Sequence, residues 1–151
     1  VMDSSSKSFT TADMDNIKSS LNSINSSTPF FVVSHCPIHY FGKRATGNAS
    51  MLVDILNNHS NVIFLWGHNH TVNDTNYGKV KISGDTIQWS KSSAAIPIKF
   101  TYANMGAMSQ GNNGAYGLLI NLIKENDSTN VKFDYKDLSG KIVSNYSVII
   151  N

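Results

Sequence analysis

Three histidines follow two apolar runs of this chain, and their type and spacing suit them to metal chemistry. His68 and His70 lie just beyond the run at residues 62–66, and His35 follows the run at residues 30–33 after a single serine. Neutral imidazole is a common protein ligand for zinc, iron, manganese and related ions. The pattern predicts a metal site, and the alternative interpretation of a His-x-His sequence is two exposed histidines.

The two apolar runs have the length of β-strands buried on both faces. The segment between them is long enough for a helical crossover, so we expect parallel neighbours joined in the right-handed sense. Parallel neighbours end at the same edge of a sheet, which is the edge where open α/β sheets bind ligands. Gly67 allows the chain to turn sharply at that edge. We therefore expect His35, His68 and His70 to converge in space.

Other residues near these histidines allow more than one interpretation. His39 could be a metal ligand, a proton donor or a loop residue that packs on Tyr40. Lys43 and Arg44 could draw in an anion, or they could simply be solvated. Cys36 is the only cysteine, which excludes an internal disulfide, and we expect a small buried hydrophobe there rather than a reactive thiol.

The composition is that of one folded domain. Of the 151 residues, 40% are hydrophobic and 15% are charged, which favours a folded core over disorder. The formal net charge is +2 without a block of lysines or arginines, so we expect no nucleic-acid partner. No apolar run approaches the ~18 residues of a membrane helix, so we expect no membrane partner. We see no internal boundary and expect a single domain over residues 1–151.

Two helices are predicted in the first part of the chain. Thr10 and Asp13 form a capping-box pattern at the start of the first. Asn48 is the expected cap of the second, over about residues 49–58. The apolar faces that we expect these helices to bury are Met14, Ile17, Leu21 and Ile24 in the first, and Met51, Leu52, Ile55 and Leu56 in the second.

The second part of the chain has the alternating pattern of strands. We expect a hairpin that turns at residues 83–85, a strand at 96–102, and a glycine-rich loop at 104–114. A central strand at 116–123 and two alternating strands, joined by a turn at 138–140, complete the prediction. The fold class is therefore α/β, with parallel strands first and mostly antiparallel strands after.

Two of these motifs, His-Cys-Pro at residues 35–37 and Gly-His-Asn-His at 67–70, resemble the late motifs of the calcineurin-like metallophosphoesterases, including the purple acid phosphatase branch. The resemblance covers most of the chain and is specific only at these two motifs. It implies that residues 1–151 are the C-terminal portion of a metallophosphoesterase domain. The implied fold is half of a four-layer αββα sandwich.

The resemblance also implies a dinuclear metal centre. His35 and His68 would bind one divalent ion and His70 the other, with zinc, manganese or iron as the candidate metals. Two ions about 3.5–4 Å apart acidify a bridging water and hold phosphate oxygens for in-line attack. The implied substrate is a phosphate ester of open class, and His39 is the candidate general acid.

The chain also departs from that family. The Asp-x-His, Gly-Asp-x-x-Asp and Gly-Asn-His motifs that supply the other ligands are absent. We therefore expect the missing N-terminal half of the domain as a partner, no hydrolysis by this chain alone, and self-association through exposed apolar surface. Two other classes stay open. One is a mononuclear zinc enzyme that uses His35, His68 and His70, and the other is a non-catalytic domain that retains the phosphoesterase fold.

Overall fold

A computed structural model describes residues 8–42, 46–108 and 115–151. Lys43 and Arg44, for which two interpretations were open, lie outside the described residues. The elements are α1 (Thr11–Asn22), β1 (Phe30–Ser34), α2 (Ala49–Leu56), β2 (Val62–Trp66), β3 (Val80–Lys81), β4 (Thr86–Ile87), β5 (Ile96–Pro97), β6 (Thr101–Asn104), β7 (Gly106–Ala107), β8 (Tyr116–Glu125), β9 (Ser128–Lys136) and β10 (Ile142–Ile150).

The sheet that carries the histidines has the strand order β1-β2-β6-β3. Strand β1 pairs parallel with β2, with Ser34 opposite Trp66 at the carboxyl ends. Strand β2 also pairs parallel with β6, and β3 joins the far side of β6 in the antiparallel sense. The prediction that the two apolar runs are parallel neighbours is confirmed.

The last strands form an antiparallel sheet with the order β10-β9-β8-β7. The odd-numbered residues of the inner strand β9 face the first sheet, and Val131, Phe133 and Tyr135 are fully buried. Strands β4 and β5 make a separate two-stranded ribbon. The predicted progression from parallel to mostly antiparallel strands is confirmed.

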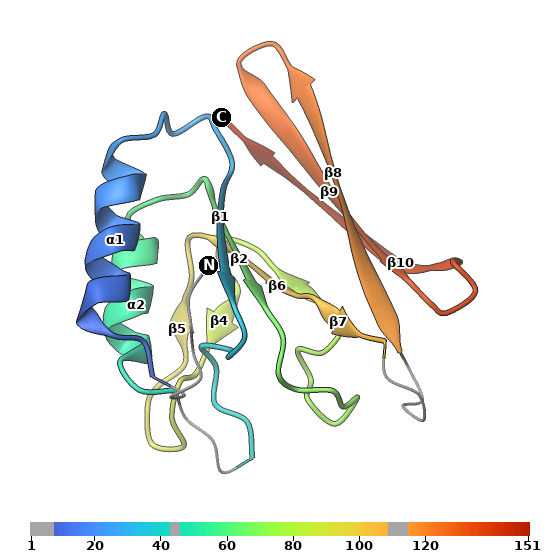
Figure 1. Ribbon diagram of the computed structural model, residues 1–151, viewed down its shortest axis with the longest axis horizontal. Helices are drawn as coiled ribbons and strands as arrows, with labels where there is room; N and C mark the ends of the chain where they lie inside the picture. Colours follow the sequence, from blue (N-terminus) through green and yellow to red (C-terminus); the bar gives the residue numbers. More distant parts are fainter. Residues whose placement is uncertain (1–7, 43–45, 109–114) are drawn as a thin grey trace.

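The described residues form three layers, which Figure 1 shows as helices, parallel-type sheet and antiparallel sheet. Helices α1 and α2 pack on one face of the β1-β2 sheet, over a cluster that includes Val32, Phe64 and Trp66. The opposite face contributes Ile63 and Leu65 to a second cluster, shared with the antiparallel sheet. Because strand β2 lies between two cores, all of its residues are buried, and its carboxyl end is rigidly placed.

The start of α1 follows the predicted capping box. The side-chain oxygen of Thr10 accepts a hydrogen bond from the backbone N–H of Asp13 (3.1 Å), and the Asp13 carboxylate accepts one from the backbone N–H of Thr10 (3.0 Å). Met14, Ile17 and Leu21 are buried as expected. These bonds satisfy donors that a helix start otherwise leaves unpaired.

The prediction for α2 was partly wrong. Asn48 precedes the helix with a φ of 61°, and its side chain donates to the carbonyl of Phe9 (2.7 Å) instead of capping the helix. The helix ends at Leu56, earlier than expected. Met51 is 53% exposed, and Val53 lies in the core together with Leu52, Leu56 and Ala49.

The pairing of the short strands also differs from the sequence prediction. A turn forms at residues 83–85, where Asp85 N–H donates to the Ile82 carbonyl (3.0 Å). However, β3 pairs with β6 and β4 pairs with β5, so no hairpin joins the segments on either side of this turn. The expected single strand at 96–102 is split into β5 and β6. The apolar alternation there reflects burial rather than one continuous ladder.

Candidate functional site at the carboxyl ends of β1 and β2

His35 and His68 meet at the carboxyl edge of the parallel strands. His68 Nδ1 lies 2.9 Å from His35 Nε2, and the two rings are almost perpendicular with centroids 4.9 Å apart. The backbone N–H of Gly67 donates to the carbonyl of His35 (3.2 Å), which joins the two loops that carry the imidazoles. The predicted convergence of these two histidines is confirmed, because parallel pairing places Ser34 and Trp66 side by side.

The backbone at His68 is strained. Its φ of 68° lies in the left-handed region, which residues other than glycine seldom occupy. The N–H of Asn69 donates to the carbonyl of Gly67 over 2.8 Å, so His68 is the central residue of a γ-turn. A γ-turn with a positive central φ is the rarer, strained form, and such strain clusters at binding and catalytic sites.

The sequence predicted that Gly67 would make the sharp turn after β2, whereas the residue with the positive φ in the structure is His68. A Cβ added at Gly67 would lie 3.6 Å from the Met105 side chain and 3.7 Å from the carbonyl oxygen of His35, which are ordinary contacts. The glycine therefore has room for a side chain, and the turn is made by the residue after it.

The geometry of the histidine pair fits two ligands of one metal ion. Nitrogens bound at ~2.0–2.1 Å to one tetrahedral zinc stand about 3.3 Å apart. The observed separation of 2.9 Å is within a few tenths of an ångström of that distance. Small rotations of the two rings would bring both nitrogens to ligand spacing.

His70 is exposed on the same loop. No group of three or more histidine, cysteine, aspartate or glutamate side chains placed to hold a metal is found in residues 8–42, 46–108 and 115–151. Of the three histidines expected to converge, the structure brings two together, and the participation of His70 stays a prediction.

His39 is buried, with only 4% of its surface exposed. Its Nδ1 lies 2.8 Å from the hydroxyl of Tyr102, and its Nε2 lies 2.8 Å from a carboxylate oxygen of Asp74. The ring packs edge-on against Trp66, with centroids 4.7 Å apart, rather than on Tyr40. Because both ring nitrogens already have protein partners, this position favours a structural part for His39 over the predicted part of general acid.

Asp74, which sequence analysis missed, is the centre of this buried network. Its carboxylate also accepts hydrogen bonds from the Asn69 amide (2.6 Å) and from the backbone N–H of Asn76 (2.9 Å). Burial by itself raises the pKa of Asp74, but the hydrogen bond and charge of His39, with the bonds from Asn76 and Asn69, lower it to about 2. Asp74 is therefore a buried, ionised carboxylate at neutral pH.

Tyr102 closes the other end of the network. Its hydroxyl accepts a hydrogen bond from the backbone N–H of Ile38 (2.8 Å) and faces His39. Burial raises the pKa of Tyr102 well above its ordinary value, so the hydroxyl keeps its proton. In the sequence, Tyr102 is one aromatic residue among several alternating ones, and Asp74 is one polar residue of a polar loop, so neither carries a recognisable signal.

The chain matches no protein-family model, no curated protein and no solved structure. Neither described helix is long and apolar enough to cross a membrane. Cys36 is buried, as expected of a small apolar side chain.

Proposed function

We propose that this chain is the C-terminal part of a metal-dependent phosphoester hydrolase and supplies histidine ligands to its metal centre. The observation that carries the proposal is the pair of imidazole nitrogens 2.9 Å apart at the carboxyl edge of two parallel strands. His35 and His68 would hold one divalent ion, of zinc, manganese or iron, and His70 would hold a second. These assignments follow the resemblance of the Gly-His-Asn-His and His-Cys-Pro motifs to the calcineurin-like metallophosphoesterases.

The residues of this chain would bind and orient the metal ions but would not supply all of their ligands. When bound, two divalent ions would supply the positive charge that offsets charge on a reacting phosphate ester. Imidazole ligands bring no negative charge to a metal ion, and no carboxylate joins His35 and His68 among the described residues. Two ions held only by imidazoles lack charge compensation, so we infer that further ligands come from another segment.

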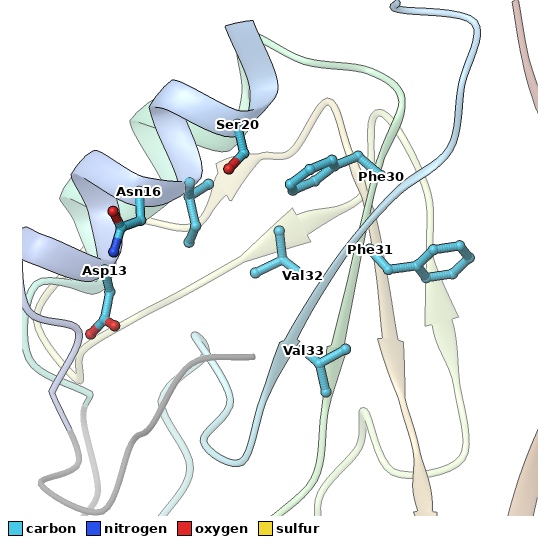
Figure 2. Close-up of a pocket in the computed structure, with 8 residues that line it drawn as sticks. Asp13, Asn16, Ser20, Phe30, Phe31, Val32 and Val33 are labelled. Atoms are coloured by element: carbon cyan, nitrogen blue, oxygen red, sulfur yellow. The ribbon is translucent and has the colours of Figure 1, made fainter. Parts of the chain in front are cut away.

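The open edge of β1 supports a further segment beside the site. No described strand pairs with the outer edge of β1, which ends its sheet. A groove of about 160 Å³ runs between this edge and α1, and Figure 2 shows Asp13 and Asn16 on the helix side and Phe30 to Val33 on the strand side. An unpaired strand edge offers backbone N–H and C=O groups to an added strand.

The antiparallel sheet has a matching open edge at β10. Tyr146 and Val148 of β10, like Phe31 and Val33 of β1, are half-buried against the second core cluster. Added strands at both edges would cover this apolar surface and complete a larger sandwich. We therefore propose the missing N-terminal half of the domain as the occupant of these edges, with the αββα sandwich as the completed fold.

Metal titration tests the proposal. Purified chain is titrated with zinc and separately with manganese by calorimetry, together with His68→Ala and the control His59→Ala, which changes a histidine in the turn before β2. We expect binding that is lost in His68→Ala and unchanged in His59→Ala. Absence of binding by the wild-type chain would favour the non-catalytic domain and would refute the proposal.

Activity separates the remaining classes. The isolated chain is assayed with a chromogenic phosphate ester and added zinc, manganese or iron, and we expect no turnover. Turnover that depends on His68, with one bound ion per chain, would instead establish a mononuclear zinc enzyme. Restoration of activity by the upstream segment of the same protein would support the proposed division of ligands between two halves.

A further inference from the structure

The buried chain of hydrogen bonds from Tyr102 through His39 to Asp74 and Asn69 connects three segments around the histidine pair. Tyr102 lies on β6, His39 lies on the loop that begins with His35, and Asn69 lies between His68 and His70. All four residues are less than 10% exposed. A buried, fully paired network of this kind fixes one arrangement of the loops that it joins.

The ionised carboxylate of Asp74 fixes the direction of its hydrogen bonds. The Tyr102 hydroxyl accepts from the Ile38 N–H and lies 2.8 Å from His39 Nδ1. Because an ionised carboxylate can only accept, His39 Nε2 carries a proton and donates it to Asp74. The Asp74 carboxylate also accepts a hydrogen bond from the side-chain amide of Asn69. One carboxylate therefore accepts from the loop that carries His39 and from the loop that carries Asn69.

The network holds the residue that closes the strained turn. The backbone N–H of Asn69 makes the γ-turn bond to Gly67, and its side chain is held 2.6 Å from Asp74. His68, with its φ of 68°, lies between these two fixed points. A non-glycine residue in this conformation is disfavoured and persists only where surrounding structure enforces it.

We propose that Asp74, oriented by His39, is a positioning residue that binds the Asn69 side chain and thereby holds His68 against His35, close to ligand spacing. This inference rests on the proposed metal function. It gives His39 a place in the site without contact with metal or substrate. It also explains why a carboxylate is buried here. One carboxylate oxygen of Asp74 accepts from both His39 and Asn69 while the other accepts from Asn76, whereas an amide would turn its NH₂ group toward one of these two sets of donors.

The test compares the zinc dissociation constants of the wild type, Asp74→Asn, Asn69→Ala and the double variant, measured by calorimetry. Asn61→Ala is the matched control. Asn61 is also buried and its amide donates to the Thr28 carbonyl (2.8 Å), but it joins loops at the opposite end of β2. Asn69→Ala and Asn61→Ala thus each remove a side-chain hydrogen bond between loops, at opposite ends of β2.

We expect zinc binding about tenfold or more weaker in Asp74→Asn and in Asn69→Ala, the scale seen for residues that orient metal ligands. The double variant should be no weaker than the worse single variant, because the two residues act as one unit. Asn61→Ala should stay within about twofold of the wild type. Equal losses in Asn61→Ala and Asp74→Asn would overturn the inference, as would additive losses in the double variant.

A metal-free measurement separates this inference from the metal proposal. Amide hydrogen exchange of residues 67–70 should be at least about tenfold faster in Asp74→Asn than in the wild type, while amides of β2 keep their protection. If the wild type binds no zinc, this measurement alone decides the positioning role. Unchanged exchange at residues 67–70 in both Asp74→Asn and Asn69→Ala would refute the positioning role. If Asp74→Asn does not fold, the exchange of Asn69→Ala alone is compared with that of the wild type.

Discussion

The ionised, buried carboxylate of Asp74 makes the stability of this protein depend on pH in a defined window. Its pKa is lowered from an ordinary 3.8 to about 2 by partners that exist only in the folded chain. A group with a lowered folded pKa stabilises the protein above its unfolded pKa, and this contribution disappears as the pH falls through the folded pKa. The stabilisation is therefore complete above about pH 4 and is lost between about pH 4 and pH 2.

The magnitude follows from the lowered pKa. At about 1.4 kcal/mol per pH unit, the shift from 3.8 to about 2 corresponds to about 2 kcal/mol of folding free energy. Because Asp74 is almost completely inaccessible, salt should screen this contribution little. It is a substantial share of the 5–15 kcal/mol that typically separates folded from unfolded domains.

Urea unfolding of the wild type and Asp74→Asn, at a series of pH values from 5 to 2, measures this contribution. The free energy of unfolding of the wild type should fall by about 2 kcal/mol more than that of the variant over this range, whatever the other carboxylates contribute to both. Asp137→Asn is the control, since the pKa of Asp137 is lowered mainly by the Ser139 hydroxyl, within the turn between β9 and β10. Parallel curves for wild type and Asp74→Asn would refute the reasoning.

Three further predictions concern the core, the first helix and the open surface. Phe133→Ala removes a fully buried ring from the second cluster and should cost about 3–5 kcal/mol in urea unfolding, whereas Leu138→Ala, at a side chain 66% exposed, should cost less than about 0.5 kcal/mol. Thr10→Ala removes the α1 cap and should lower stability by about 1 kcal/mol, measured by thermal unfolding; an unchanged melting temperature would contradict the capping role. The wild-type chain should self-associate at high concentration, and Leu122→Lys, at a position 54% exposed, should reduce light scattering more than the control Leu138→Lys does.

The sequence determined the elements whose signals are local. The capping box of Thr10 and Asp13 needs only neighbouring residues, and it formed as predicted. The two apolar runs became β1 and β2, and the handedness of parallel crossovers allows few other arrangements. The meeting of His35 and His68 was therefore predictable, because His35 directly follows β1, His68 follows β2 after one residue, and the two strands were predicted to be neighbours.

Only the tertiary structure decided the features that depend on distant partners. Strand β3 is two residues long and pairs with β6 rather than forming the expected hairpin, since a short strand has too few local contacts to fix its own partner. The burial of His39 depends on Tyr102 and Asp74, which lie 63 and 35 residues away from it in the chain. A histidine four residues beyond a predicted ligand looks like a catalytic group when its hydrogen-bond partners are unknown. The ionised state of Asp74 and the strained φ of His68 likewise arise from packing between loops, because a hydrogen bond between segments far apart in the sequence leaves no periodic trace in either segment.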